Sequence, residues 1–246
     1  MSVISVQSRP AILATVAHEL RGPLTALETA SEILDRDFDL LDPKQMRSMI
    51  SSIHRRALWL RGLAENLLCA ATIGDGNLWI HRRPVDLHEV IDEVAALLQP
   101  LLNRKDQRLR IRARAIPLVA ADGHRVTQVL LNLVSNAHKY APPGTAVVVA
   151  VATRGACVRV TVADHGPGIP AANADRLFEP YYRAGRVGGE GIGIGLSVVR
   201  SIVEAHGGTA GFRNRQTGGA VFWVELPVMG ASMLSDNNAT DDGRVR

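Results

Sequence analysis

The stretch AHELRGPL, residues 17–24, places a histidine and a carboxylate side by side about one helical turn before a proline. It lies within residues 10–37, which otherwise have the pattern of a long amphipathic helix. An imidazole on a helix surface can act as a nucleophile, and a neighbouring carboxylate can orient the ring or accept its proton. A single exposed histidine on a helix is more often without function. This interpretation of His18 and Glu19 therefore requires a group for the histidine to attack.

Two long helices are predicted at the start of the chain. In the first, over 10–37, leucines recur at intervals of seven: Leu13, Leu20, Leu27 and Leu34. Asp42 and Pro43 have the pattern of an N-cap followed by a first-turn proline, and a second helix is predicted from there to Thr72. Its apolar positions alternate spacings of four and three residues: Met46, Ile50, Ile53, Ala57, Leu60, Ala64, Leu67 and Ala71. This alternation is typical of coiled-coil-like packing.

A helical hairpin of this kind cannot bury both of its apolar faces by itself. Pairing with a second copy would give a dimeric four-helix bundle, whereas the alternative is a monomeric hairpin that packs on the rest of the chain. We expect the homodimer. Counting from Leu13 as a core position, His18 falls on the side of the helix that faces away from the seam, so it is predicted to be exposed.

The remainder of the chain mixes helices with strands that are mainly linked by hairpins. Helices are predicted over 85–102, 122–140 and 196–206; an extended segment over 78–83; and strands over 108–114, 145–153, 157–164, 208–214 and 220–226. This order predicts an α+β sandwich with helices layered on one face of a sheet. The expected fold is multidomain, α and then α+β: an N-terminal extension over 1–9, the helical hairpin over 10–73, a linker over 74–84, the α+β domain over 85–228 and a disordered tail over 229–246.

Composition limits the class of protein. Hydrophobic residues make up 46% and charged residues 21% of the 246-residue chain, as in ordinary soluble globular proteins. The net charge of +4 is compatible with a bound nucleotide, but the arginines are scattered, so no nucleic-acid partner is expected. No apolar run approaches the roughly 18–20 residues that span a bilayer, and residues 1–10 lack the apolar core of a secretion signal. We therefore expect a cytoplasmic location and no membrane span in this chain.

The first of three polar clusters in the second domain is NLVSNAHKY, residues 132–140. Asn132 and Asn136 are one helical turn apart, so their amides project from the same face. Two amides on an otherwise apolar helix suit a Mg²⁺ ion that already carries phosphate oxygens, because Mg²⁺ takes few protein ligands and keeps its waters. Lys139 adds a positive charge for phosphate, and Tyr140 adds an aromatic face. The alternative is an amphipathic helix with two buried, hydrogen-bonded asparagines.

The second cluster, DHGPG at residues 164–168, follows an apolar strand. A carboxylate at a strand end, here Asp164, can accept a hydrogen bond from a nucleobase amine, and the glycines Gly166 and Gly168 let a flat ring approach the backbone. Taken alone, the cluster is equally a simple Asp-Gly turn.

The third cluster, GGEGIGIGLS at residues 188–197, leads into a predicted helix. Glycines at the start of a helix expose backbone N–H groups to an anion such as phosphate. The spacing is not the dinucleotide-binding fingerprint, since no strand directly precedes it, and no Gly-Lys-Ser/Thr ends it as in a P-loop. The alternative is a flexible surface loop.

The order and spacing of these clusters resemble the catalytic core of bacterial two-component sensor histidine kinases. Residues 18–24 resemble the phosphoacceptor box of the HisKA-type dimerisation and histidine-phosphotransfer domain. Residues 132–140, 164–168, 177–183 and 191–196 resemble, in order, the N, G1, F and G2 boxes of the GHKL-type ATP-binding domain. The likeness runs from about Pro10 to Pro227, nearly the whole chain.

The resemblance implies ATP as the nucleotide and Mg²⁺ as the metal. It implies that Asn136 and Asn132 hold Mg²⁺, that Lys139 contacts phosphate, that Tyr140 packs beside adenine, and that Asp164 accepts from the adenine amine. Gly166 and Gly168 would shape the adenine pocket, and Gly193, Gly195 and Leu196 would present N–H groups to the phosphates. An ATP lid is implied over about 169–192, with Gly191 among its glycine hinges, Phe178 as its anchor and Arg183 reaching the γ-phosphate.

The resemblance also implies that ATP phosphorylates His18, with Glu19 as hydrogen-bond partner and base, and that an aspartate in a response regulator receiver domain then takes the phosphoryl group. The family usually has Thr or Asn at the position of Gly22, where the polar side chain positions the water that dephosphorylates the partner. We therefore expect weak phosphatase activity. No sensor segment is recognisable in the sequence, so we expect input from a region N-terminal to this sequence, from a separate sensor protein, or no input at all.

Two alternatives keep the ATP-binding fold. One is a catalytically degenerate GHKL scaffold, against which the presence of His18, Glu19, Asn136 and Asp164 argues. The other is a different GHKL ATPase, such as an anti-sigma-factor serine kinase or a gyrase-type hydrolase. Those proteins lack a helical hairpin with a His-Glu pair before the ATP-binding domain, so the first seventy or so residues distinguish them.

Overall fold

The computed structural model describes residues 8–74, 78–183 and 192–229, and it describes their side chains except at 8–13, 73 and 74. Gly191, the central part of the expected lid, and the expected tail beyond Met229 lie outside the described residues. Of the described helices, none is both long and apolar enough to cross a membrane.

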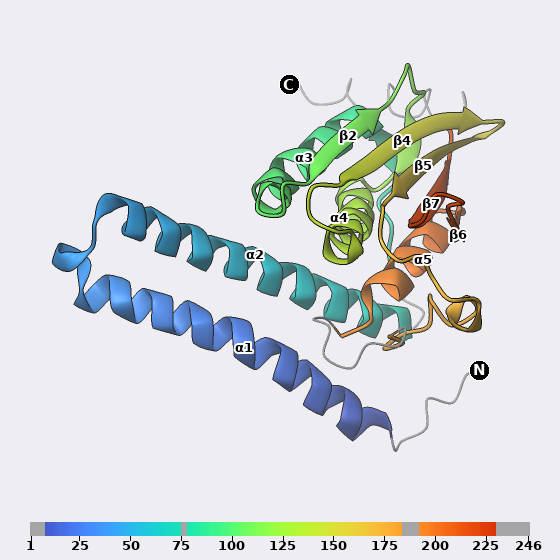
Figure 1. The fold of residues 1–246 in the computed structure, drawn as a ribbon. Coiled ribbons are helices and arrows are strands. Elements are labelled where there is room, and N and C mark those ends of the chain that lie inside the picture. The colour runs from blue at the N-terminus through green and yellow to red at the C-terminus, as the bar shows by residue number, and fades with distance from the viewer. Residues whose placement is uncertain (1–7, 75–77, 184–191, 230–246) are drawn as a thin grey trace, which may run out of the picture.

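The chain begins with the expected helical hairpin (Figure 1). Helix α1, Ser8–Arg36, continues through Pro23, and the short 3-10 turn η1, Phe38–Leu40, connects it to helix α2, Pro43–Gly74. Asp42 caps α2 as predicted: its Oδ1 accepts hydrogen bonds from the backbone N–H groups of Lys44 and Gln45, both over 2.8 Å. The Gln45 side chain accepts from Asp42 N in return, which completes a capping box and fixes where α2 begins.

The predicted seam of α2 divides into two sets. Met46, Ile53, Leu60 and Leu67, spaced by seven, are half-buried, whereas the intervening positions Ile50, Ala57, Ala64 and Ala71 are exposed. Within a single chain, about half of the apolar seam of α2 is therefore covered and the other half stays open.

The second part of the chain is an α+β sandwich, as predicted. Its main sheet has the order β2-β4-β5-β7-β6, in which only β2 and β4 are parallel. The strands are β2 Arg108–Arg112, β4 Ala146–Arg154, β5 Cys157–Ala163, β6 Thr209–Asn214 and β7 Ala220–Pro227. The helices are α3 Leu87–Asn103, α4 Gly123–Tyr140 and α5 Gly195–Ala205, and the turn η2 spans Ala171–Asn173.

Alternation along the central strands fixes which face carries the helices. In β5, Val158, Val160 and Val162 are buried while the residues between them are more exposed. The same alternation in β4 and β7 gives one apolar face, and it shares a single core with α3, α4 and α5. This layering brings the end of β5, the C-terminal half of α4 and the start of α5 together at one side of the domain (Figure 1).

The start of this domain differs from the sequence prediction. The extended segment was predicted over 78–83 and the helix over 85–102. In the structure, strand β1 spans Arg83–Val85, so α3 begins only at Leu87. Asp86 sets this boundary, since its carboxylate caps the helix by accepting from His88 N over 2.8 Å. Strand β3, Val119–Ala121, which pairs with β1, was not predicted because three residues are too few for a periodic pattern.

The hairpin and the sandwich share apolar cores. Cys69, near the end of α2, is buried in the main core of the sandwich. A second cluster joins Leu63 of α2 to Ile192 and Ile194, which precede α5; half-buried members packed on it are Val16, Leu20, Leu67 and Tyr181. Helix α1, helix α2 and the two chain segments that flank residues 184–191 therefore meet in one place.

Candidate active site

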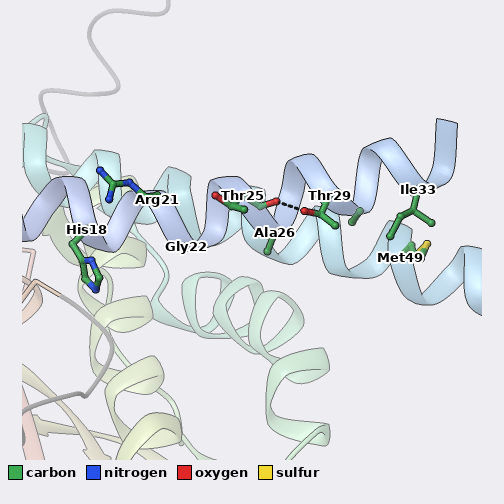
Figure 2. A pocket seen from close by; sticks show the side chains of 9 residues that line it. His18, Arg21, Gly22, Thr25, Ala26, Thr29, Ile33 and Met49 are labelled. Atoms are coloured by element: carbon green, nitrogen blue, oxygen red, sulfur yellow. Dashed lines mark hydrogen bonds between the residues drawn. The ribbon is translucent and has the colours of Figure 1, made fainter. Parts of the chain in front are cut away.

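His18 lies on the exposed side of α1, as predicted, with Glu19 half-buried beside it. An open groove of about 700 Å³ runs along α1 from this histidine, with residues of one helical face as its lining: His18, Arg21, Gly22, Thr25, Ala26, Thr29, Ala30 and Ile33, with Met49 from α2 (Figure 2). Gly22 is exposed, and a Cβ added there would have no heavy atom within 4 Å. A partner could therefore approach both His18 and Gly22 from the same side.

Helix α4 carries the two asparagines of the first polar cluster on its C-terminal half. Asn132 is engaged by a residue of α2: its Oδ1 accepts from Asn66 Nδ2 over 2.9 Å, and its Nδ2 donates to Asn66 Oδ1 over 3.1 Å. The half-buried amide of Asn136 makes no hydrogen bond to any residue that the structure describes. Its carbonyl oxygen is the type of neutral ligand that a hard cation such as Mg²⁺ accepts.

The end of α4 presents an aromatic face with a positive charge above it. Tyr140 is 56% exposed, and Lys139 Nζ lies 5.1 Å from the centroid of its ring. The backbone carbonyl of Tyr140 also faces Gly166: a Cβ added to Gly166 would stand only 3.1 Å from the carbonyl oxygen of Tyr140. Glycine at this position therefore allows the end of β5 and the end of α4 to approach closely.

Asp164 is 5% exposed at the end of β5, and its two carboxylate oxygens have different surroundings. Oδ1 accepts from the backbone N–H groups of Gly166 over 2.7 Å and of Ala220 over 3.2 Å. Oδ2 accepts no hydrogen bond from any described residue. The first oxygen therefore holds the side chain in place, and the second is available to a donor on a ligand.

The end of the glycine-rich stretch is tied to the segment before residue 184. Tyr181 N donates to Gly193 O over 3.0 Å, so the two ends of 182–192 are held together. Gly193 has a φ of +80°, and a Cβ there would lie 2.7 Å from Tyr182 O. Only glycine suits this position, because the conformation is left-handed and the space is closed.

Gly195 begins α5 and faces the asparagine cluster. A Cβ on Gly195 would stand 3.2 Å from Asn132 Oδ1. No described side chain caps α5, so among the described residues nothing covers the N–H groups of its first turn, which suit an anion. The structure thus brings Asn132 and Gly195, which are far apart in the sequence, to one place, with Leu196 half-buried beside them.

The segment before the glycine-rich stretch is fastened by aromatic contacts. Phe178 is buried, and its ring centroid is 6.5 Å from that of Phe212 on β6. The guanidinium of Arg200 on α5 lies 4.2 Å from the centroid of the Phe178 ring. Tyr182 donates its hydroxyl hydrogen to Asn173 Oδ1 over 2.7 Å. Arg183, exposed, is the last described residue before 184–191.

Comparison with known proteins accounts for both halves of this arrangement. Residues 9–76 match the model of the His Kinase A (phospho-acceptor) domain, and residues 121–230 match the model of the histidine kinase-, DNA gyrase B- and HSP90-like ATPase. The sensor protein KdpD of Escherichia coli K12 is 33% identical over 231 residues, which are 94% of this chain and 26% of KdpD. The chain belongs to the sensor histidine kinase family.

Two solved kinase structures resemble the fold. Full-length ShkA in complex with AMPPNP has a TM-score of 0.65 and 29% identity, and the match covers 90% of this chain and 46% of that chain. Histidine kinase ThkA in complex with the response regulator TrrA has a TM-score of 0.60 and 25% identity, covering 91% of this chain and 63% of that one. The chain thus spans about a quarter of the length of KdpD and part of each of these structures.

Three residues of this candidate site were not identified by the sequence analysis. Asn66 reaches Asn132 from the other domain. Asn214 holds the segment after Gly168, since its side chain accepts from Ile169 N over 2.9 Å and donates to Ile169 O over 2.7 Å. Gly219 has a φ of +88°, and a Cβ added there would overlap the backbone carbonyl oxygen of Asp164. The Gly218-Gly219 pair between two predicted strands was a turn signal, but Asn66 and Asn214 had none.

Proposed function

We propose that this kinase transfers the γ-phosphoryl group of ATP to His18 and then to an aspartate in the receiver domain of a response regulator. The observation that carries the proposal is the second apolar cluster. Val16 and Leu20, on either side of His18 in the sequence, pack on the same cluster as Ile192 and Ile194, which lead from the glycine-rich stretch into α5. The helix of the acceptor histidine and the expected phosphate-binding backbone are therefore neighbours.

The pocket around Asp164 and α4 would hold the nucleotide. Asp164 Oδ2 would accept from the adenine amine, beside Tyr140 and over Gly166 and Gly168. Lys139 would contact phosphate, and the N–H groups at Gly193, Gly195 and Leu196 would hold the phosphate oxygens, because no side chain in the described part of the chain caps the start of α5. Phe178 would anchor the lid, with Gly191 as a hinge and Arg183 reaching the γ-phosphate. AMPPNP, an analogue of ATP that resists hydrolysis, is bound by the similar kinase ShkA, which supports this assignment.

The donor set fits Mg²⁺. Asn136 offers an amide oxygen without a competing hydrogen bond among the described residues, and Asn132 lies one turn away. Bound there, Mg²⁺ would neutralise charge on the phosphates. Catalysis by the protein itself would consist of holding the reacting atoms in line and supplying positive charge from Lys139 and Arg183.

The chemical step is a displacement at phosphorus. The lone pair of one His18 ring nitrogen attacks the γ-phosphorus, an N–P bond forms, and the bond from phosphorus to the bridging oxygen breaks to release ADP. The other ring nitrogen gives up its proton, and Glu19 is the neighbouring carboxylate that would orient the ring and accept that proton. The phosphoryl group then passes from nitrogen to a carboxylate oxygen of the receiver aspartate.

The open half of the hairpin seam supports a homodimer. Ile50 of α2 is 58% exposed in the single chain, and Leu24 of α1 and Leu68 of α2 are also exposed. Pairing two such hairpins would bury these side chains in a four-helix bundle. The ThkA–TrrA complex supports a response regulator as the second partner. A separate sensor protein is the third partner that we propose.

Autophosphorylation tests the proposal. The full chain is incubated with γ-labelled ATP and Mg²⁺, alongside His18→Gln, Asn136→Ala and His54→Gln, the last an exposed histidine of α2 as matched control. Wild type and His54→Gln are expected to take up acid-labile, alkali-stable label, and the other two variants none. Label that survives in His18→Gln would refute the acceptor. Nucleotide binding without any label would favour the degenerate scaffold, whereas the match of residues 9–76 to the phospho-acceptor model argues against another GHKL ATPase.

A further inference from the structure

A three-amide junction joins helix α2 to the metal-binding face expected on α4. Asn66 of α2 and Asn132 of α4 exchange two hydrogen bonds, with Nδ2 of each donating to Oδ1 of the other over 2.9 and 3.1 Å. Gln128, one turn before Asn132, donates from Nε2 to Asn66 Oδ1 over 3.0 Å. Both polar atoms of the Asn132 side chain are therefore turned toward α2.

The surroundings hold this arrangement in place. Gln128 is buried, and its own carbonyl oxygen accepts from Arg125 over 3.0 Å, which fixes the orientation of its amide. Leu63 and Leu67 lie on the same face of α2 as Asn66 and pack on the apolar cluster with Ile192 and Ile194. Apolar packing thus brings the helices together, and Asn66 bonds to Asn132, the α4 amide that faces Gly195 at the start of α5.

We propose that Asn66 is a positioning residue that withholds the Asn132 carbonyl oxygen from Mg²⁺, so that docking of α4 on α2 and binding of Mg²⁺–nucleotide compete. This inference rests on the proposed function, in which Asn132 is a metal ligand. An amide oxygen that accepts a hydrogen bond from Asn66 must turn or share its lone pairs before it can ligate a cation. By linkage, Mg²⁺–nucleotide weakens the contact between the hairpin and the ATP-binding domain by the same factor.

Metal dependence separates this role from a merely structural one. If Asn66 acts through Asn132 and the metal, its removal changes the affinity for Mg²⁺–nucleotide and leaves the affinity for metal-free nucleotide nearly unchanged. If it only stabilises the domain contact, both affinities change together. The expected size is that of one net hydrogen bond, about three- to tenfold in Kd.

The experiment is calorimetric titration of the full chain with AMPPNP, in Mg²⁺ and in EDTA. Asn66→Ala is expected to bind Mg²⁺–AMPPNP about three- to tenfold more tightly than wild type, and metal-free AMPPNP within about twofold. In a chain that already carries Asn132→Ala, adding Asn66→Ala should not change the affinity for Mg²⁺–AMPPNP. Asn103→Ala, a surface asparagine of α3 with one side-chain partner, Gln99, is the matched control and should bind as wild type does.

In Asn66→Ala, Gln128 could replace Asn66 as the hydrogen-bond partner of Asn132. The double variant Asn66→Ala/Gln128→Leu is therefore titrated as well, and its affinity for Mg²⁺–AMPPNP should rise by at least as much. Unchanged or weaker Mg²⁺–AMPPNP binding in both variants overturns the proposal, as does an equal gain in EDTA or a gain that persists with Asn132→Ala. Failure of wild type to bind Mg²⁺–AMPPNP would instead overturn the proposed function and, with it, this inference.

Discussion

The backbone N–H of Asp122 donates a hydrogen bond to Nε2 of His206 over 2.9 Å, which ties the start of α4 to the end of α5. On the other side of the ring, Nδ1 bonds to the carbonyl of Ile202 over 2.7 Å. A carbonyl only accepts and an N–H only donates, so His206 must be neutral with its proton on Nδ1. The helix that carries the two asparagines and the helix proposed to bind phosphate are thus held together by a fully buried imidazole.

This contact predicts loss of stability on mild acidification. Burial lowers the pKa of His206 in the folded state below its ordinary value of about 6.5, and Arg82 and Arg125 oppose the charged form further, while Ile202 and Asp122 favour it. Burial and Lys105 lower the pKa of His138 in the same direction. Below pH 6.5 the unfolded chain binds protons that the folded chain does not, so stability is present at neutral pH and falls as the pH falls.

Urea unfolding between pH 7.5 and pH 5.5 measures this effect. Wild type should lose stability across the range, and His206→Gln, which cannot titrate, should show a flatter dependence. His206→Ala should cost about 2–4 kcal/mol at pH 7.5, because it removes a buried side chain and two hydrogen bonds. His54→Gln, at an exposed position on α2, serves as control and should keep the wild-type pH profile. A wild-type stability that is constant over the range would contradict the prediction.

Gly193→Ala should weaken nucleotide binding. The residue is left-handed at a φ of +80°, and a Cβ would meet Tyr182 O at 2.7 Å, so the contact that joins Tyr181 to Gly193 must open. We expect at least about a tenfold loss of AMPPNP affinity, from a clash added to the roughly 1–2 kcal/mol cost of a left-handed alanine. Gly155→Ala, also left-handed but with open space around its Cβ, isolates the cost of the backbone and should bind nucleotide normally. Equal binding by both variants would show that the close approach at Gly193 is unimportant.

Some features of the fold and the candidate site could be predicted from the sequence alone. The asparagine spacing on α4 and the cap at Asp42 depend on neighbours within a few residues, and local pattern was enough to predict them. The general α+β order followed from strand and helix periodicity in the same way. Where a cap decided a boundary, as Asp86 does for α3, periodicity placed the helix start two residues too early.

Long-range pairs could not be predicted. Asn66 is 66 residues from Asn132 and stands within a coiled-coil-like helix, where nothing in the pattern distinguishes it from a solvated asparagine. Gly219 is required because the carbonyl of Asp164 passes against it, and that approach exists only once β5 and β7 are paired. Such contacts arise only when distant helices and strands pack together, so they leave no pattern in the nearby sequence.

Asp164→Asn should reduce ATP affinity and its selectivity over GTP. The N–H groups of Gly166 and Ala220 point at Oδ1, so the asparagine carbonyl must take that place and its NH₂ group must replace Oδ2. A donor would then face the adenine amine. We expect ATP affinity to fall about tenfold or more, on the scale of a hydrogen bond to a charged group, with GTP affected less. Competition with a fluorescent nucleotide measures both, and Asp175→Asn, exposed, is the control. Unchanged ATP affinity would remove Asp164 from the adenine pocket.

Ile50→Glu should dissociate the proposed dimer. Ile50 is 58% exposed in the single chain and belongs to the open half of the α2 seam, so a carboxylate there would be buried without a partner on pairing. Light scattering at micromolar concentration should report a monomer for this variant and a dimer for wild type. Leu40→Glu, which changes an apolar residue of η1 that is exposed outside the seam, should remain dimeric. A wild-type monomer, or a dimeric Ile50→Glu, would be evidence against pairing through this face.

Gly22→Thr should raise the weak phosphatase activity expected of this kinase. Gly22 and His18 line one groove, and a Cβ at Gly22 meets nothing within 4 Å, so threonine fits without displacing a neighbour. Its hydroxyl would supply the polar group that the family's phosphatase uses to position water, and threonine is also the better helix former by a few tenths of a kcal/mol. We expect severalfold faster release of phosphate from a phosphorylated receiver domain. Gly62→Thr, an equally open glycine of α2, controls for the gain in helix stability and should release phosphate at the wild-type rate. Rapid release by wild type, or none by Gly22→Thr, would show that residue 22 does not limit the reaction.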